Sequence, residues 1–263
     1  MTDAASSRPA KPRIRAAFER AAGSYDRAAE VQRRICQHLL QQLPDDMAPR
    51  CLLDAGCGTG YALPLLQARF PEARPLALDF SPAMLRHTSA SAPAGTLAVA
   101  GDIEQLPLAT ASVDLYWSSL AVQWCDLGRA LAEARRVLRP GGALALATLG
   151  PATFAELRLA FAGVDRHAHT LRFTDARTVG ERAAALGLRR VEVATHHEVA
   201  HYPDFRSLLK AVKAVGANQV GDGRRTSLLG REAFRRAEAA AEASRVAAGL
   251  PLGYEVITLL ARA

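Results

Sequence analysis

Hydrophobic positions along residues 50–149 alternate between short apolar runs and segments with apolar residues three and four positions apart. Runs of this length that are separated by amphipathic helices are typical of a parallel sheet with helices on both faces. The pattern therefore predicts a doubly wound α/β core. The expected strands are CLLDAG, PLALDF, TLAVA, VDLYWSS and GGALALATL.

The region before this core is helical in pattern. Residues 14–43 carry apolar groups at helical spacing, which predicts two cap helices that are broken at Gly23-Ser24. Residues 1–13 are polar and contain proline, so we expect a disordered tail there.

The region after the core has a looser rhythm. We expect residues 150–200 to complete the core with a helix on the substrate side, and residues 201–250 to form a helical lid that is broken at GANQVGDGRR. The alternating YEVITLLAR within residues 251–263 predicts a final strand. Residues 14–263 are thus expected to form a single domain.

Three glycines at alternate positions follow the first expected strand, in the stretch LLDAGCGTGYA. Ligands of an open parallel sheet bind beyond the carboxyl ends of its strands, and glycine lets a ligand approach the backbone closely. The spacing of Gly56, Gly58 and Gly60 differs from the dinucleotide fingerprint G-x-G-x-x-G, and no G-K-[ST] follows for a triphosphate. Asp54, directly before the loop, would repel a pyrophosphate and suits a ligand with a positive charge.

Two further acids follow the next two expected strands. Asp79 ends the run PLALDF, where a carboxylate can accept hydrogen bonds from a ribose diol. Asp102 follows the run AVAGD, where a carboxylate can accept from an exocyclic amine. Together with Asp54, these positions describe a pocket for a nucleoside with a cationic amino-acid tail, which is S-adenosylmethionine.

These residues resemble the class I methyltransferase pattern, with D-x-G-x-G-x-G after strand one, acids after strands two and three, and RVLRPGG before strand five. The resemblance implies a Rossmann-like, mostly parallel sheet with an antiparallel last strand. It also implies that Asp54 lies near the methionine amino group, that Asp79 binds the ribose and that Asp102 with Ile103 holds the adenine. The expected cofactor residues are Tyr25, Gln32, Asp54, Gly56, Gly58, Gly60, Asp79, Phe80, Met84, Asp102, Ile103 and Ser118.

Other segments are more discriminating. The stretches AAFERAAGSYDRAAEVQRRICQHLL, SSLAVQWCDL, TLGPATFAELRLAFAGVDRHAHTLRF and LPLGYEVI resemble the malonyl-[acyl-carrier protein] O-methyltransferases of biotin synthesis, often called BioC. One departure is Ser118-Ser119, where relatives usually carry an asparagine. The resemblance implies methylation of the free carboxylate of a malonyl thioester, with S-adenosylhomocysteine as the second product. The methyl ester would then prime pimeloyl synthesis for biotin.

The implied chemistry needs no catalytic acid or base. A carboxylate with an ordinary pKa near 4 is already ionised at neutral pH, so alignment and water exclusion are expected to carry catalysis. Tyr25 and Gln32 are expected to close over the cofactor. The substrate-side candidates, from the family pattern or because an anionic substrate requires donors, are Gln123, Trp124, Arg158, His169 and Arg172.

The charge and composition of the chain limit the kinds of partner that we expect. The net charge is +7, and residues 151–263 carry 17 Lys and Arg against 12 Asp and Glu, which favours an acidic partner such as malonyl-acyl-carrier protein, or only a solvated helix face. The four cysteines lack C-x-x-C spacing, and the histidines lack partners at ligand spacing, so no metal site is expected. We expect a cytoplasmic monomer without a membrane span or a nucleic-acid partner.

Three alternatives share most of these features. A methyltransferase of a small acid such as trans-aconitate, or of a quinone, would use nearly the same cofactor residues. An RNA methyltransferase would suit the positive charge, but no N/D-P-P-Y motif follows strand four and no aromatic and basic residues interleave as a stacking groove requires. A cofactor-binding protein without catalysis is the third alternative. Whether a carrier-protein or a coenzyme A thioester is preferred stays open.

Overall fold

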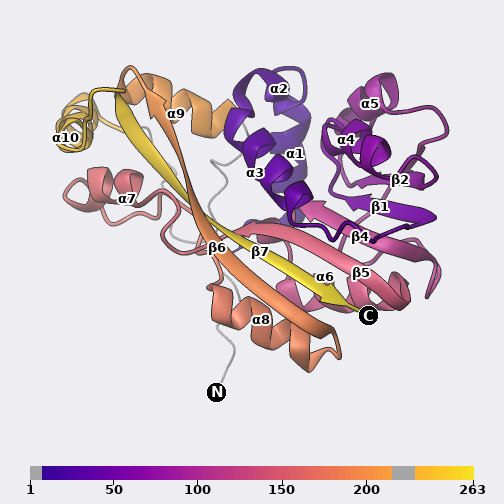
Figure 1. Cartoon of the computed structure of the whole chain (residues 1–263). Helices are drawn as coiled ribbons and strands as arrows, with labels where there is room; N and C mark the ends of the chain where they lie inside the picture. Colours follow the sequence, from indigo (N-terminus) through magenta and orange to yellow (C-terminus); the bar gives the residue numbers. More distant parts are fainter. Residues whose placement is uncertain (1–7, 215–228) are drawn as a thin grey trace.

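The computed structural model describes residues 8–214 and 229–263. Within them one mixed sheet runs through the molecule in the order β3-β2-β1-β4-β5-β7-β6 (Figure 1). Its first five strands are parallel, and β7 is antiparallel to both of its neighbours. The strands are β1 (Cys51–Ala55), β2 (Arg74–Asp79), β3 (Leu97–Ala100), β4 (Val113–Ser119), β5 (Leu138–Leu149), β6 (Arg189–Tyr202) and β7 (Leu250–Arg262). The predicted doubly wound α/β sheet with an antiparallel last strand is confirmed.

The two faces of the sheet form two hydrophobic cores, because successive side chains of a strand point to opposite faces. Leu52 and Trp117 lie in the core beneath the helices α3 (Glu30–Gln41) and α4 (Ala62–Arg69). Leu53 and Tyr116 lie in the core against α6 (Leu127–Val137) and α8 (Ala176–Ala185). All four side chains are fully buried. The helices that flank the core are α4 (Ala62–Arg69), α5 (Pro82–Ser91), α6 (Leu127–Val137), α7 (Ala155–Ala162) and α8 (Ala176–Ala185).

Three short helices form the N-terminal cap: α1 (Lys11–Ala21), α2 (Tyr25–Ala28) and α3 (Glu30–Gln41). The expected break at Gly23-Ser24 separates α1 from α2, and a second break at Ala29, where ψ is +32°, divides the rest. The expected tail was too long, because α1 already begins at Lys11. Pro12 permits this early start, since a proline in the first turn of a helix loses no hydrogen bond.

The last two strands form a long hairpin that projects beyond the rest of the sheet (Figure 1). They pair as far as Tyr202 with Leu250, so β6 continues into residues 201–250, the region that we expected to be helical. The helices α9 (Phe205–Ala214) and α10 (Arg231–Glu242) lie at the outer end of this hairpin, and α10 packs against α7. The expected break at residues 216–225 lies outside the described residues.

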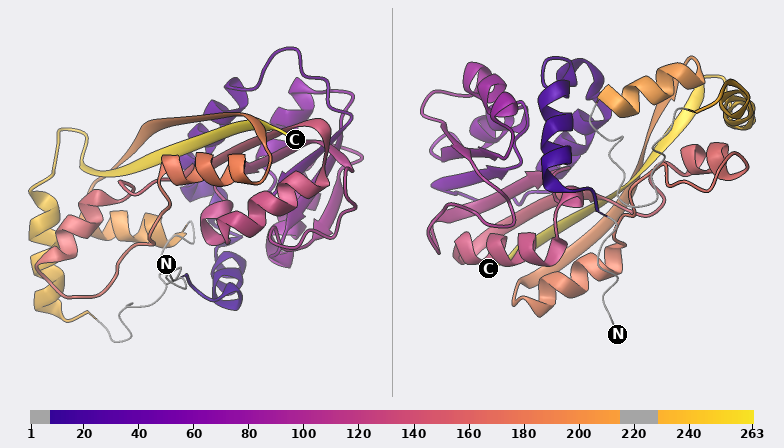
Figure 2. Two further views of the ribbon diagram at one scale, coloured as in Figure 1. Left: turned by 90° about the horizontal axis from the view of Figure 1, so that it is seen from below. Right: turned by 180° about the vertical axis from the view of Figure 1, so that it is seen from behind.

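The cap stands between two groups of helices. Figure 2 shows α1, α2 and α3 with α4 and α5 on one side and α9 on the other, and α2 contacts α9 directly. None of the described helices is both long enough and apolar enough to cross a membrane.

We predict that the cap contributes strongly to stability. Ile35 of α3 is fully buried against the sheet, so Ile35→Ala should lower the free energy of unfolding by about 2–5 kcal/mol, as truncations in a packed core do. Urea denaturation would measure this loss, with the exposed Arg20→Ala on α1 as the control that changes little. A loss as small as that of the control would mean that the cap packs loosely.

Candidate active site

A cavity opens at the carboxyl ends of the parallel strands, beneath the cap. It encloses about 1070 Å³, counting the open space at its mouth. The wall combines the glycine loop after β1, the turns after β2 and β3, the end of β4, and residues of all three cap helices. The sequence-predicted residues in this wall are Tyr25, Gln32, Asp54, Gly56, Gly58, Asp79, Phe80, Met84, Asp102, Ile103 and Trp124.

The three glycines of the loop have positive φ but different surroundings. A Cβ on Gly56 would meet the Cβ of Ala121 at 2.3 Å, so this glycine allows close packing of the loop on the end of β4. A Cβ on Gly60 would press on Thr88 of α5. A Cβ on Gly58 would meet no protein atom within 4 Å and would point into open space. Gly58 is therefore the glycine that leaves room for a ligand.

Asp79 ties two loops together at the end of β2. Its carboxylate accepts a hydrogen bond from the backbone N–H of Gly58 at 3.0 Å and another from that of Ser81 at 2.8 Å. Burial raises the pKa of this carboxyl to about 6, although the amide donors favour the ionised form and oppose the shift. Asp79 thus fixes the glycine loop and still faces the cavity with oxygen lone pairs.

Asp54 is the most isolated polar group of the site. It is 2% exposed, and its Oδ2 atom has no hydrogen-bond partner among residues 8–214 and 229–263. Burial, and then the nearby Asp79, raise the pKa of Asp54 to about 8. A buried carboxyl without a partner is costly, so this position fits a cationic ligand that would stabilise the ionised form.

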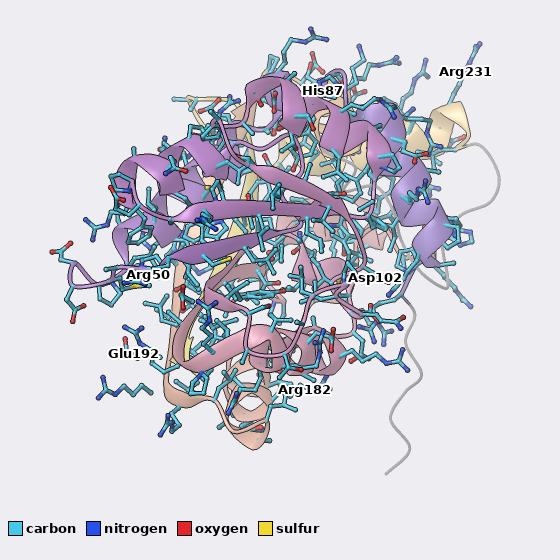
Figure 3. All side chains as sticks on the ribbon, turned by 90° about the vertical axis from the view of Figure 1, so that its right-hand side faces the viewer. Arg50, His87, Asp102, Arg182, Glu192 and Arg231 are labelled. Carbon is cyan, nitrogen blue, oxygen red and sulfur yellow. The ribbon has the colours of Figure 1, made fainter. Side chains whose placement is uncertain are left out.

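Asp102 lies in the cavity wall after β3, beside the start of α1 (Figure 3). Its carboxylate accepts from the backbone N–H of Glu104 at 2.9 Å and pairs with Lys11 of the cap, which also contacts Glu104 at 3.0 Å. Ile103 beside it is buried. An apolar side chain next to a carboxylate suits an aromatic base that carries an amine, because the ring can pack on the one and donate to the other.

Aromatic rings close the cavity from above. Phe18 of α1 packs edge-on against Trp124 and Phe80, with ring centroids 5.6 and 6.4 Å apart, and Tyr25 lies 6.5 Å away. These rings come from the cap, the β2 turn and the short helix η1 (Val122–Trp124). Phe18 therefore joins the cap to the sheet edge directly over the cavity.

A smaller space, here called the inner chamber, adjoins the cavity. Its empty space is about 460 Å³, counting the part that opens to solvent. Both spaces are lined by Phe18, Tyr25, Gln32, Leu120 and Trp124. The rest of its lining is Gln123, Leu149, Phe154, Leu171, Phe173 and Tyr254. The chamber is thus mainly apolar, with neutral polar groups at a few points.

The two glutamines of the chamber differ in their contacts. Gln123 donates through Nε2 to the carbonyl of Leu120 at 2.7 Å. The Oε1 atoms of Gln32 and Gln123 are buried and have no partner within the described part of the chain. Their amides are therefore polar groups that a ligand in the chamber can engage.

Three other substrate-side candidates lie apart from Gln123 and Trp124. Arg158, His169 and Arg172 line a separate depression, here called the outer pocket, between α7 and residues 163–173. Arg158 donates to the carbonyls of Pro151 and Thr153, and His169 contacts the Asp165 carboxylate at 2.9 Å. The structure therefore divides the expected substrate-side residues between two spaces.

Two expected cofactor residues lie outside the cavity wall. Gly60 faces Thr88, as described above, and Ser118 donates its hydroxyl to the carbonyl of Ala55 at 2.7 Å, fully buried between β4 and β1. Ser119, the next residue, lines the cavity instead, because side chains alternate along a strand.

Sequence reasoning missed several residues of the wall. Lys11 was assigned to the tail, although the helical spacing of Ile14 and Phe18 could have been extended back to it. Leu120 carries no sequence signal, yet its φ of +56° at the end of β4 marks a strained position of the kind that clusters at functional sites. The described residues contain no group of three or more side chains arranged to hold a metal ion.

Comparison with known proteins points to one chemistry. A family model described as a methyltransferase domain matches residues 53–146. The chain is 59% identical over 258 residues to the malonyl-[acyl-carrier protein] O-methyltransferase of Dechloromonas aromatica (strain RCB), covering 98% of this chain and 97% of that one. It is 43% identical to the protein of the same name from Laribacter hongkongensis (strain HLHK9), covering 94% and 87%.

Two more distant matches extend this result. The biotin biosynthesis bifunctional protein BioHC of Cellvibrio japonicus (strain Ueda107) is 35% identical, and the match covers 95% of this chain and 50% of that protein. Among solved structures, the YcgJ protein of Bacillus subtilis superposes with a TM-score of 0.60 at 15% identity, covering 87% of this chain and 97% of that one. The likeness to YcgJ is one of fold.

We predict that Asp54 makes the ligand-free protein less stable as the pH rises. With a native pKa of about 8 against roughly 4 in the unfolded chain, Asp54 keeps a proton in the native state that the unfolded state has already lost. The free energy of unfolding should therefore fall between about pH 4 and pH 8, by at most roughly 1.4 kcal/mol per pH unit.

The neutral variant Asp54→Asn isolates this contribution. Urea denaturation of both proteins at pH 5, 6, 7 and 8 should give a difference in unfolding free energy that grows with pH in favour of the variant. A constant difference across this range would mean that the Asp54 carboxyl is already ionised in the native state.

Proposed function

The chain belongs to the family of malonyl-[acyl-carrier protein] O-methyltransferases, and we propose that it transfers a methyl group from S-adenosylmethionine to the free carboxylate of a malonyl thioester. The physiological acceptor would be malonyl-acyl-carrier protein, and the methyl ester would enter biotin synthesis. The observation that carries the proposal is the pairing of a cavity suited to the cofactor with an adjoining apolar chamber suited to an acyl group.

The residues of the cavity fit the parts of the cofactor. The unpartnered Oδ2 of Asp54 would accept from the α-ammonium group, and the lone pairs of Asp79 would accept from the ribose hydroxyls. Asp102 and Ile103 would hold the adenine, with Lys11 exchanging its contact on Asp102 for Glu104 alone. When bound, the cofactor supplies an electrophilic methyl group on a positively charged sulfur.

The inner chamber would receive the malonyl carboxylate. Its lining contains no cationic side chain among the described residues, and its donors would be the Tyr25 hydroxyl, the Trp124 indole N–H and the amide nitrogens of Gln32 and Gln123. Burial raises the pKa of the Tyr25 hydroxyl above its usual range, so it stays a donor. A carboxylate in such surroundings loses water and keeps its nucleophilic oxygens, while the sulfonium provides the opposite charge.

The cap would exclude water from this reaction. Thr59 of the glycine loop donates to Asp26 of α2 at 2.7 Å, and Gln37 of α3 donates to the hydroxyl of Tyr61 at 2.8 Å. Both bonds join the cap to the segment that follows β1. Holding the acceptor oxygen and the methyl group in line supplies the catalysis, since no general base is required.

The direct test is intact-mass spectrometry of malonyl-acyl-carrier protein after incubation with the purified protein and S-adenosylmethionine. We expect one added methyl group on the malonyl form and none on acetyl-acyl-carrier protein, which lacks the free carboxylate. No addition to the malonyl form, with cofactor binding established by calorimetry, would exclude this acceptor and direct the search to small acids such as trans-aconitate.

We also predict that Gly58→Ala weakens cofactor binding at least tenfold, because its methyl group would fill the approach to the backbone. Isothermal titration calorimetry with S-adenosylmethionine would measure the loss. Gly95→Ala is the matched control, since Gly95 also has positive φ and open space at its Cβ but does not line the cavity. Equal affinity losses in both variants would mean that backbone strain, and not the filled space, is responsible.

A further inference from the structure

The inner chamber and the outer pocket share part of their walls. Leu171 and Phe173 line both spaces, so one loop of chain separates the place for the acyl group from a depression that opens to solvent. Leu171 is 8% exposed and Phe173 is half-buried. A long, narrow substrate that enters from this side would pass along these two side chains.

The outer pocket has an apolar floor and a basic rim. Phe161 is buried and stacks against His169 with a centroid separation of 3.8 Å and an interplanar angle of 10°. Arg158 and the exposed Arg172 supply permanent positive charge at the rim, and His167 also lines the pocket. Such a surface accepts a partly apolar chain that ends in an anion.

Within residues 8–214 and 229–263, the lining of the pocket holds more basic side chains than acids. Asp165 is its one carboxylate there, and it already accepts from His169 and from the backbone N–H of His167. Arg158 donates to the carbonyls of Pro151 and Thr153, which fixes its guanidinium with only part of its donor set in use. Planar guanidinium groups of this kind bind phosphate oxygens well.

We propose that the outer pocket binds the phosphate of the phosphopantetheine arm that carries the malonyl group, with Arg172 and Arg158 as its ligands. The inference rests on the proposed function, and it adds the route of the acyl thioester. The pantetheine chain would lie along Leu171 and Phe173, the thioester and the malonyl group in the inner chamber, and the phosphate at the basic rim. Acyl-carrier protein and coenzyme A both carry this arm, so the outer pocket would bind a phosphate that the two substrates share.

The proposed placement gives the two anionic groups of the substrate, the malonyl carboxylate and the phosphate, separate binding spaces. The malonyl carboxylate must reach the methyl group, and the inner chamber offers it neutral donors. The arginines line a different space, where they can bind a second anion without pairing with the nucleophile and lowering its reactivity.

The test compares the kcat/KM of methyl transfer to malonyl-phosphopantetheine and to malonyl-pantetheine, which differ only in the phosphate. The wild-type protein should prefer the phosphorylated thioester about tenfold or more, the factor that one charge-assisted hydrogen bond provides. Arg172→Ala should remove most of this preference, with a much smaller loss on malonyl-pantetheine. Malonyl-coenzyme A and malonyl-acyl-carrier protein, tested in parallel, separate the two natural sources of the arm.

Arg166→Ala is the matched control. Arg166 is an exposed arginine of the same loop that does not line the outer pocket, so its removal should retain the preference for the phosphate. Two results would overturn the assignment. In the first, Arg172→Ala loses the same share of kcat/KM on both thioesters. In the second, Arg166→Ala loses as much of the preference for the phosphate as Arg172→Ala does.

The outcomes also separate this inference from the function on which it rests. If the wild-type protein methylates every malonyl thioester without a preference for the phosphate, the proposed phosphate site is excluded and the methyltransferase activity stands. No transfer to any malonyl thioester would remove both.

Discussion

One buried carboxylate determines the shape of the whole site. Asp79 accepts from the backbone of Gly58 and of Ser81, so a single side chain at the end of β2 holds both the loop after β1 and the start of α5. The positive φ of Gly58 and the open space at its Cβ exist because the loop is held in this conformation. The floor of the cofactor cavity therefore depends on a group whose charge is expensive to bury.

The neighbouring Asp54 is a second buried carboxyl. Burial, and then the nearby Asp79, raise its pKa, and its Oδ2 has no partner among the described residues, so Asp54 holds its proton more strongly than Asp79 does. A cationic ligand would relieve both the desolvation and the repulsion. Binding energy would thus be stored in the ligand-free site as an unfavourable pair of acids, and this arrangement would favour a ligand with a positive charge.

Much of the fold and of the cavity wall could be predicted because their determinants are local. Asp54, Asp79 and Asp102 each follow an apolar run, and parallel strands bring such positions to one edge of a sheet. The grouping of the substrate-side residues could not be predicted in this way. Arg158 and Gln123 lie in different spaces because of how one loop folds between α7 and α8, and no sequence period records that path.

The cap shows a second limit of local reasoning. Lys11 looks like part of a polar tail in the sequence, and its place beside Asp102 depends on the packing of Phe18 against rings from three other elements. Ser118 shows the opposite case. The sequence predicts it to be a cofactor residue, but its hydroxyl is buried in a hydrogen bond to the carbonyl of Ala55. Spacing identifies the edge of the sheet, and packing decides which side chains line the cavity.

The position of β7 has a consequence for how the protein is made. This strand follows the other strands of the described sheet in chain order, yet it lies between β5 and β6 and pairs with both. As the ribosome extends the chain, β5 has an unpaired edge and β6 has no partner until β7 has emerged. The nascent protein therefore exposes unpaired strand edges from the synthesis of β5 until that of β7, and this interval is when a chaperone would protect it from aggregation.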